Sequence, residues 1–311
     1  MSHLRNKRIA ITGSKGFLGK SLTKELDNNG IKYSEVLNHC CDLTQFDQVD
    51  NFFKDLKPDL VFHLAADCGG IGYNVKNPAD ITHNNLMMST NLFRSAVKHG
   101  NPKLIMIGSV DSYPSEAKIP YSENEIWMGF PEVTSGYYGL AKRMNLALGN
   151  AYFNQYGLHS IHPILMNLYG PNDHFDSEKG HVIPAMIKKI DQAIKDDLTE
   201  IEIFGNGSVF REFIYVEDAA KLIIKASSLN NFEYFNLGSG DLIKIIDVIS
   251  IIKNKFGYSG LFNHNMSKPI GHKIKQFDLR KMEKLLGQFD FTPFSEGITK
   301  TINWYNENLK K

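Results

Sequence analysis

A short apolar run followed by a glycine-rich turn constrains the fold of this chain more than any other stretch. Residues 7–12 read Lys-Arg-Ile-Ala-Ile-Thr, and glycines then recur in the spacing Gly13-x-x-Gly16-x-x-Gly19 before a helix pattern that runs to Gly30. Gly13 suits a tight turn, Gly16 lets backbone approach a pyrophosphate, and Gly19 lets the helix pack close to the strand. The stretch therefore predicts a dinucleotide-binding unit with phosphates at the helix N-terminus, and a plain strand-to-helix turn is the alternative.

Strands and helices alternate through the first half of the sequence. We expect strands near residues 31–37, 59–66, 103–109 and 158–166, and helices from after Gly19 to Gly30, near residues 45–56 and 77–99, and around Tyr138. Such alternation predicts βαβ units, which build a doubly wound parallel Rossmann sheet of the α/β class. In sheets of this kind ligands bind beyond the carboxyl ends of the strands.

The regular alternation loosens after residue 166. The sequence contains no linker rich in Pro, Gly or Ser and no internal repeat, so we expect two parts in close contact. The second part is predicted to be a smaller, interleaved α/β lobe that binds the substrate. On this division, residues 1–166 and 212–237 form the dinucleotide-binding domain, and residues 167–211 and 238–311 form the substrate-binding lobe.

The charge balance argues against two classes of partner. The formal net charge is +1 and no long charged block occurs, so neither nucleic acid nor a membrane surface is an expected partner. No stretch approaches eighteen consecutive apolar residues, and the N-terminal residues lead into a strand without the apolar region of a signal peptide. We therefore expect a cytoplasmic protein.

The three cysteines indicate neither a disulfide framework nor a metal site. The spacing of Cys40, Cys41 and Cys68 matches no zinc pattern, and we expect no metal. Cys40 and Cys41 are expected to pack as small hydrophobic residues in a reducing compartment. Cys68 follows a predicted strand end, and a packed thiol is favoured over one that faces a ligand pocket.

A serine, a tyrosine and a lysine are spaced for proton transfer beside a bound cofactor. Ser109 ends an apolar run at the carboxyl edge of the predicted sheet, and Tyr138 and Lys142 stand four residues apart on one face of a predicted helix. The Lys142 ammonium is expected to lower the pKa of the Tyr138 phenol, which would then exchange a proton near neutral pH. The alternative is that a Tyr and a Lys four apart are common on any exposed helix.

The choice between NAD and NADP rests on residues near the second strand. An acidic residue at its end holds the ribose hydroxyl of NAD, whereas basic residues accommodate the extra phosphate of NADP. Asn38 is neither, and Lys15 in the glycine turn is placed to reach such a phosphate, so NADP is weakly favoured. Asp42 is a candidate for the adenine amino group, and a solvated turn carboxylate is a comparable alternative.

Further short motifs accompany the glycine turn, Ser109 and the Tyr138/Lys142 pair. They are Gly69-Gly-Ile, Pro78-Ala-Asp, Asn167-Leu-Tyr-Gly-Pro-Asn-Asp, Phe175, His181-Val-Ile-Pro-Ala and Arg211-Glu-Phe. With these motifs the chain resembles the extended short-chain dehydrogenase/reductase family, and within it most closely the GDP-L-fucose synthase group of epimerase/reductases. The matches span residues 9–218, and the last ninety residues match only loosely.

The resemblance implies an NAD(P)-dependent oxidoreductase that acts at C4 of a GDP-linked hexose or heptose. Ser109 and Tyr138 would hydrogen-bond the C4 oxygen, with Tyr138 as proton donor, and Lys142 would bridge the nicotinamide ribose. The other implied cofactor contacts are Gly13, Lys15, Gly16, Phe17, Leu18, Gly19, Asn38, Asp42, Leu43, Leu64, Ala65 and Ala66. The other implied contacts of the nucleotide sugar are Gly70, Asn167, His181, Val182, Phe204, Arg211 and Lys275. Arg211 would grip diphosphate oxygens, and pairing with Glu212 or Asp218 is its alternative.

One residue departs from the epimerising members of the family. They carry a cysteine two residues after the catalytic serine, which works with a histidine to exchange protons at C3 and C5. Here that cysteine position is Asp111, while His181 matches the histidine. An unperturbed Asp has a pKa of about 3.9 and is a poor match to proton exchange near pH 7.

Three outcomes follow for Asp111 and His181: they still epimerise, hydride transfer persists without epimerisation, or Asp111 binds a different substituent of the substrate. We favour hydride transfer without the double epimerisation. The rival predictions are a full 3,5-epimerase/4-reductase and a non-catalytic or regulatory protein that binds nucleotide sugar. Helices near residues 84–99 and 136–155 resemble those that form a four-helix interface in relatives, which predicts a homodimer.

Overall fold

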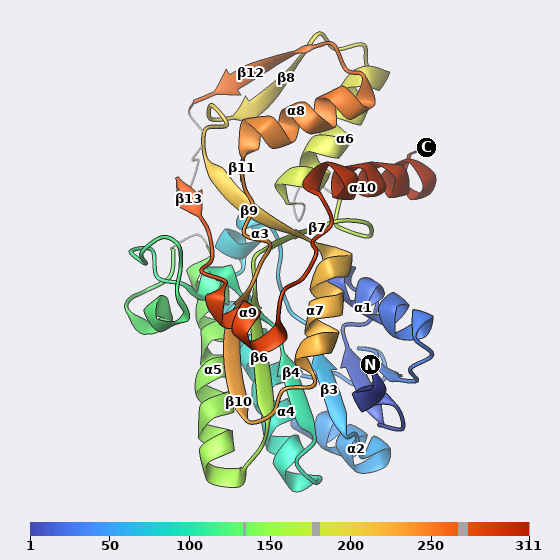
Figure 1. Ribbon diagram of the computed structural model, residues 1–311, viewed down its shortest axis with the longest axis vertical. Helices are drawn as coiled ribbons and strands as arrows, with labels where there is room; N and C mark the ends of the chain where they lie inside the picture. Colours follow the sequence, from blue (N-terminus) through green and yellow to red (C-terminus); the bar gives the residue numbers. More distant parts are fainter. Residues whose placement is uncertain (133–134, 176–180, 267–272, 311) are drawn as a thin grey trace.

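A seven-stranded parallel sheet forms the larger part of the protein, as the computed structural model of residues 1–132, 135–175, 181–266 and 273–310 shows (Figure 1). Its strands are β1 (Ile9–Thr12), β2 (Ser34–Val36), β3 (Leu60–His63), β4 (Lys103–Met106), β5 (Gly108–Ser109), β6 (Ser160–Leu165) and β10 (Phe232–Leu237). They lie in the order β10-β6-β4-β3-β1-β2, and the short β5 also pairs with β6. The predicted doubly wound α/β sheet is therefore confirmed.

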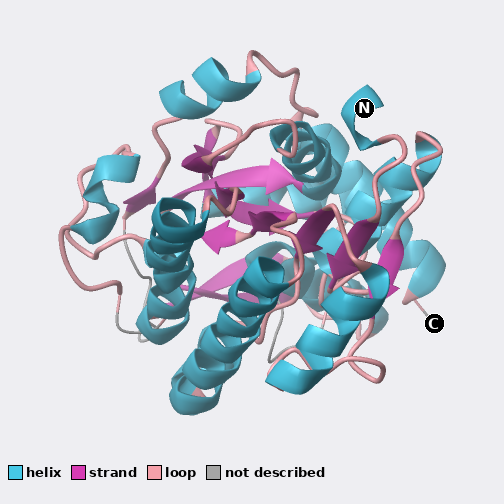
Figure 2. Cartoon of the chain, turned by 90° about the horizontal axis from the view of Figure 1, so that it is seen from below, coloured by secondary structure: helices cyan, strands magenta, loops and turns pink. Residues whose placement is uncertain are grey.

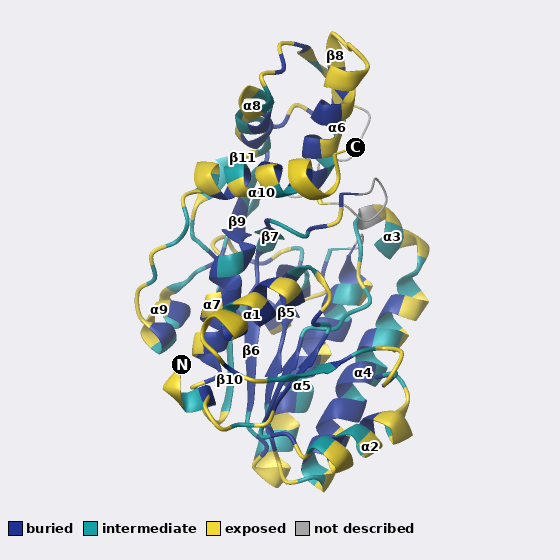
Figure 3. Cartoon of the chain, turned by 90° about the vertical axis from the view of Figure 1, so that its right-hand side faces the viewer, coloured by how far each residue is buried: buried dark blue, intermediate teal, exposed yellow. Residues whose placement is uncertain are grey.

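Helices cover both faces of this sheet (Figure 2). The helices α1 (Phe17–Asn28) and α7 (Val216–Ala226) pack together on one face, and α2 (Phe46–Leu56), α4 (Pro78–Lys98) and α5 (Gly136–Tyr156) pack in a row on the other. Side chains alternate between the two faces of a strand. Ile9 and Ile11 accordingly enter the core under α1 and α7, while Ala10 enters the core under α2 and α4. Burial on both faces explains why these strands read as short continuous apolar runs (Figure 3).

The second part stands at the carboxyl edge of the large sheet (Figure 1). It contains a four-stranded mixed sheet and a parallel pair of strands. The four strands are β7 (Asn167–Tyr169), β9 (Phe210–Tyr215), β11 (Leu242–Lys244) and β13 (Ile274–Lys275), and the pair is β8 (Glu200–Phe204) with β12 (Leu261–Asn265). Helices α6 (Val182–Lys195), α8 (Ile245–Phe256) and α10 (Phe294–Asn308) bury a separate core with these strands. The shorter helices are α3 (Ile71–Lys76) and α9 (Arg280–Leu286).

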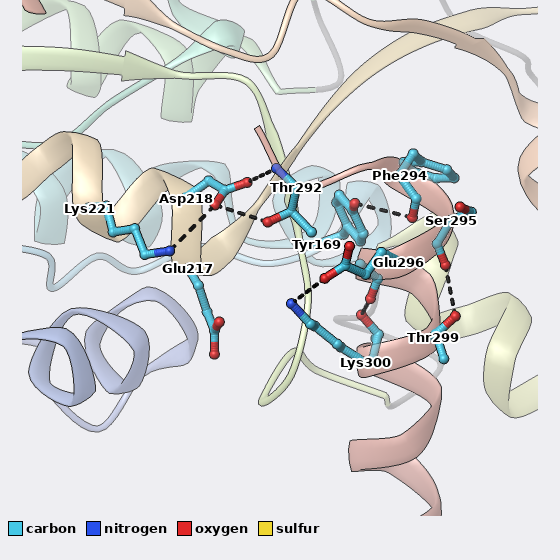
Figure 4. Close-up of polar contacts among 12 residues, drawn as sticks. Tyr169, Glu217, Asp218, Lys221, Thr292, Phe294, Ser295, Glu296, Thr299 and Lys300 are labelled. Carbon is cyan, nitrogen blue, oxygen red and sulfur yellow. Dashed lines mark hydrogen bonds and ion pairs between the residues drawn. The ribbon is translucent and has the colours of Figure 1, made fainter. Parts of the chain in front are cut away.

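A buried carboxylate ties the start of α7 to the segment that leads into α10 (Figure 4). Asp218 is 2% exposed, and its two oxygens accept from the backbone N–H of Thr292 at 2.7 Å and from the Thr292 hydroxyl at 3.1 Å. A buried carboxylate is costly unless it is hydrogen-bonded, so this pair fixes where the chain crosses from one part to the other.

Helix α5 lies directly on the 3₁₀ turn of residues 110–112, which follows β5. A Cβ atom at Gly139 would stand only 1.9 Å from the backbone oxygen of Asp111. The Ser112 hydroxyl donates to the backbone oxygen of Gly139 at 3.1 Å, and Arg143 Nε donates to that of Ser112 at 2.9 Å. These contacts hold the helix that carries Tyr138 against the strand that carries Ser109.

This contact predicts that Gly139→Ala destabilises the protein by about 2 kcal/mol or more, because the added methyl meets backbone that cannot rotate away. Thermal or urea unfolding measures the change. The matched control is Gly72→Ala on α3, where a Cβ meets nothing within 4 Å and where we expect a change of at most about 0.5 kcal/mol. Equal stability of the two variants would show that α5 does not depend on this close approach.

Candidate active site

The glycine turn has the shape that a pyrophosphate needs. Gly13 has φ of +69°, and a Cβ there would stand 2.6 Å from the backbone nitrogen of Ala65. A Cβ at Gly19 would stand 2.1 Å from the backbone oxygen of Gly13, so the helix packs as closely as the sequence predicts. Gly16 caps α1 without a side chain, and within the described residues the buried Ser14 hydroxyl has no hydrogen-bond partner. Open amides at a helix N-terminus and an unmatched hydroxyl fit a phosphate ligand.

The glycine turn and the end of β3 lie side by side, as a dinucleotide site requires. Thr12 pairs with His63, and the Thr12 hydroxyl accepts from the backbone N–H of Ala65 at 3.3 Å. Leu64, Ala65 and Ala66 follow β3 at the point where the strand order changes direction, between β1 and β3. Phe17 and Leu18 open α1 on the same edge. These predicted cofactor residues are therefore brought together.

The residues near the end of β2 do not form the expected arrangement in which one residue at the strand end contacts the adenine ribose. Lys15 Nζ lies 2.7 Å from Glu35 Oε2, an acidic residue that the sequence interpretation missed. Asp42 accepts from the backbone N–H and the hydroxyl of Thr44 at 2.9 and 2.8 Å, which is the turn-carboxylate alternative. Asn38 is exposed and Leu43 is buried in the core. Glu35 pairs with Ile11 across β1 and β2, and this register, which local sequence pattern does not specify, places the carboxylate near the glycine turn.

Ser109, Tyr138 and Lys142 meet at the carboxyl edge of the large sheet. Ser109 ends β5, and Lys142, only 3% exposed, has its Nζ 5.8 Å from the centre of the Tyr138 ring. Burial lowers the pKa of Lys142 to about 8. Burial also raises the pKa of Tyr138 well above its usual value, and Cys68 and Asp111 add to that rise. The predicted lowering by Lys142 is wrong for the protein without ligands, because loss of water around the phenol outweighs the nearby ammonium.

Cys68 lies in the site, contrary to the prediction of a packed thiol. It is exposed, and its thiol shares a hydrogen bond with the Tyr138 phenol. Its position directly after a strand that ends at the ligand edge was the signal that could have placed it. Cys41 is buried as predicted, whereas Cys40 is exposed because it sits in the turn after β2.

Asp111 is the centre of a small charged cluster beside Ser109. Its backbone N–H donates to the Ser109 hydroxyl at 3.2 Å, and that hydroxyl is 3.5 Å from Asp111 Oδ2. Lys275 Nζ lies 3.5 Å from Asp111 Oδ1 and 3.4 Å from Glu132 Oε2. All three charged side chains are mostly buried, with 16–26% exposure. The cluster joins the strand end of the large sheet to β13 of the smaller part.

His181 faces the same region from the start of α6. Its Nδ1 lies 3.6 Å from Asp173 Oδ1, and Asp173 raises the pKa of His181, with a smaller contribution from Asp111. Asp173 itself is buried. The histidine is therefore held by one carboxylate while a second, Asp111, acts on it across the site.

Four of the predicted substrate residues line one pocket. Asn167, His181, Val182 and Arg211 border it together with Phe213 and Ile245. The Asn167 side chain donates to the backbone oxygen of Glu212 at 2.9 Å, which orients it next to Arg211. Gly70 lies apart from this pocket lining and opens α3. Phe204 ends β8, but its side chain lies outside the part of the chain that the structure describes, as do residues 176–180.

Arg211, which borders this pocket, lies beside Lys275 in the smaller sheet. They are register partners on the parallel strands β9 and β13, so their side chains leave the sheet on the same face. The carboxylates proposed as alternative partners of Arg211 have other donors. Glu212 accepts from the backbone N–H groups of Phe277 and Gly240, and Asp218 accepts from Thr292.

Comparison with known proteins gives consistent matches over almost the whole chain. The model of the NAD dependent epimerase/dehydratase family matches residues 9–238. GDP-L-fucose synthase 1 of Arabidopsis thaliana is 32% identical over 307 residues, which cover 98% of this chain and 95% of that protein. The structure of a GDP-L-fucose synthetase from Naegleria fowleri bound to NADP has a TM-score of 0.89 at 28% identity and covers 99% of this chain and 96% of that one. A GDP-mannoheptose C4 reductase from Campylobacter jejuni with NADP bound has a TM-score of 0.87 at 28% identity, with coverage of 97% and 98%.

Among the helices of the described residues, none combines the length and the apolar character that crossing a bilayer requires.

The buried Lys142 predicts an unusual pH dependence of stability in the cofactor-free protein. Its pKa of about 8 lies below the ordinary 10.5, so the unfolded state binds more protons and stability rises with pH between these values. Lys142→Met removes this cost and should stabilise the protein at pH 7 by up to about 3 kcal/mol, with a gain that shrinks as the pH approaches 10. Urea unfolding over this pH range measures it.

The control for this prediction is Lys54→Met, which alters an exposed lysine on α2. It should leave the slope of stability against pH unchanged. A Lys142→Met protein that is less stable than the unaltered chain at pH 7 would contradict the assigned burial cost.

Proposed function

We propose that this chain, which belongs to the NAD dependent epimerase/dehydratase family, is an NADP-dependent oxidoreductase that transfers hydride at C4 of a GDP-linked hexose or heptose without double epimerisation. The observation that carries the proposal is the meeting of Ser109, Tyr138 and Lys142 beside the glycine turn, at the ligand edge of the sheet. Several relatives that match over almost their full length are named for GDP-sugar synthesis or C4 reduction, and structures of such relatives contain NADP.

The cofactor is assigned to residues 1–166 and 212–237. Gly13, Gly16 and the first turn of α1 would hold its pyrophosphate, and Lys15 would meet the ribose phosphate of NADP once it leaves Glu35. Held there, the cofactor would place its nicotinamide to supply or accept the hydride. NADP is preferred over NAD because Lys15 lies in the glycine turn, where a cation can meet that phosphate, and a comparison of NADPH with NADH as reductant tests the choice.

Tyr138 supplies the proton when the C4 carbonyl is reduced. Its raised pKa keeps the phenol protonated at neutral pH, and its hydroxyl gives the proton to the C4 oxygen as the alkoxide forms. Lys142, with a pKa of about 8, is mostly charged at pH 7 and offsets the phenolate that is left behind. Ser109 donates to the same oxygen and fixes its position.

The nucleotide sugar is assigned to residues 167–211 and 238–311. Arg211 and Lys275 lie side by side and would provide two positive charges for the diphosphate. Asn167 lines the pocket next to Arg211 and is the further polar contact assigned to the nucleotide sugar. The sugar then reaches from this pair toward Ser109, because Asp111 bridges Lys275 and Ser109.

Epimerisation at C3 and C5 is not part of the proposed reaction. It needs a base that is free to take a proton from carbon, whereas the Asp111 carboxylate is engaged with Lys275 and Ser109. The full 3,5-epimerase/4-reductase is the rival function, since Asp111 and His181 act on each other across the site.

The function is tested by incubating the purified protein and NADPH with a panel of GDP-4-keto sugars. We expect loss of nicotinamide absorbance and a C4 alcohol in the NMR spectrum of the product. The same reactions in deuterium oxide should leave C3 and C5 of the product unlabelled, whereas labelling there would establish the rival epimerase.

Tyr138→Phe is the matched variant for this experiment. It should lower kcat by roughly 100-fold or more while NADPH still binds, because it removes only the proton donor. Absence of turnover with every sugar, or full activity of Tyr138→Phe in the cell, would instead favour a non-catalytic nucleotide-sugar-binding protein.

The proposed assembly is a homodimer built from α4 and α5. These helices pack side by side, and α5 presents Tyr137 and Met144, 50% and 43% exposed, one heptad apart. Large apolar side chains that share an exposed helix face suit a self-complementary interface about a two-fold axis.

Met144→Glu tests this interface. Two like charges brought together at the axis should raise the dimer dissociation constant by roughly tenfold or more, as measured by analytical ultracentrifugation. Leu198→Glu, at an exposed apolar residue of the smaller part, is the control and should leave the dimer intact. A dimer that tolerates Met144→Glu would place the contact elsewhere.

A further inference from the structure

Asp111 contacts, or acts electrostatically on, several residues that are assigned to the sugar site. Its Oδ2 lies 3.5 Å from the Ser109 hydroxyl, and its charge raises the pKa of both Tyr138 and His181. Its side chain is 25% exposed, so it is enclosed by the site without being sealed off from it. The carboxylate therefore stands where the ring of the sugar would lie.

Lys275 fixes the direction in which this carboxylate points. Lys275 Nζ lies 3.5 Å from Asp111 Oδ1. Lys275 is in turn positioned by the pairing of β13 with β9 and by its ion pair with Glu132. The two oxygens of Asp111 are thus divided between Lys275 and the Ser109 side. A carboxylate has about four acceptor sites, so Oδ2 keeps capacity for another donor.

Building on the proposed function, we propose that Asp111 determines sugar specificity by accepting a hydrogen bond from the C3 hydroxyl, so that the enzyme selects sugars with a free hydroxyl at C3. Ser109 is assigned to the C4 oxygen, and hydroxyl oxygens on neighbouring ring carbons stand about one hydrogen-bond length apart. A carboxylate next to Ser109 therefore reaches the oxygen on a neighbour of C4. Of the two neighbours, C3 carries a hydroxyl, whereas C5 carries a carbon substituent and the ring oxygen.

This contact assigns a function in substrate binding to Asp111, which replaces the cysteine of the epimerising family members. A cysteine sulfur is a weak acceptor, whereas a carboxylate accepts strong, charge-assisted hydrogen bonds. A carboxylate turned toward the hydroxyl oxygen is not aligned with the hydrogen on C3. The same geometry that adds a substrate contact therefore disfavours proton exchange at that carbon.

The test compares two GDP-4-keto-6-deoxy sugars that differ only in the presence of the C3 hydroxyl. The unaltered enzyme should show kcat/KM roughly 10- to 100-fold higher for the hydroxylated sugar, as expected for a hydrogen bond to a charged group. Asp111→Ala should reduce this ratio to about one, because the activity on the hydroxylated sugar falls further than the activity on the sugar that lacks the hydroxyl. Glu132→Gln alters the other carboxylate partner of Lys275 and should keep the preference.

Equal losses of Asp111→Ala on both sugars would overturn the proposal, because they would mean that Asp111 only positions Ser109 or Lys275. A preference that follows a hydroxyl at C6, in a matched pair of sugars that differ there, would also overturn it. Calorimetric binding of the two GDP-sugars provides a readout without turnover. If no sugar is reduced but Asp111→Ala still abolishes a C3-dependent difference in affinity, the proposed reaction fails and the specificity contact stands.

Discussion

The absence of a side chain at Gly139 lets α5 rest directly on the turn that follows β5. The sheet delivers Ser109 to its carboxyl edge, but Tyr138 and Lys142 come from a helix on one face of that sheet, and nothing in a βαβ repeat sets their distance from the serine. The close backbone approach, together with the hydrogen bonds of Ser112 and Arg143, sets it. The proton donor, its cationic neighbour and the serine thus become one rigid unit.

The same arrangement buries the charge of Lys142, which destabilises the resting protein. Lys142 is almost fully buried, and burial together with the charge of Lys142 lowers the pKa of the His63 imidazole to about 3. His63 is therefore neutral at pH 7, and in this buried site the field that the Lys142 ammonium exerts on a developing phenolate is screened less than it would be in water. A group that destabilises the resting protein is retained because its charge acts when the phenol gives up its proton.

The sequence predicted the parts of the site that depend on local pattern and missed those that depend on contacts between distant segments. The strand, glycine turn and helix, the parallel sheet and the Ser109, Tyr138 and Lys142 set follow from spacing and alternation, and the family resemblance is confirmed. The pairing of Lys15 with Glu35 and the exposure of Cys68 do not, since they depend on strand register and on the course of a loop. The effect of burial on pKa was also missed. Spacing suggested that Lys142 lowers the pKa of Tyr138, whereas burial raises that pKa above its usual value.

The smaller sheet shows why a carboxylate at position 111 affects more than one step of binding. Glu212 is fully buried and accepts from the backbone N–H groups of Phe277 and Gly240, which keeps β13 beside β9 and sets Lys275 next to Arg211. Two adjacent cations repel each other, and Asp111 and Glu132 offset that repulsion before a diphosphate arrives. A thiol in place of Asp111 would leave Lys275 with less compensation and more freedom to meet phosphate. Asp111 therefore couples the two ends of the substrate. One carboxylate both accepts from the sugar and partly neutralises Lys275, which faces the diphosphate.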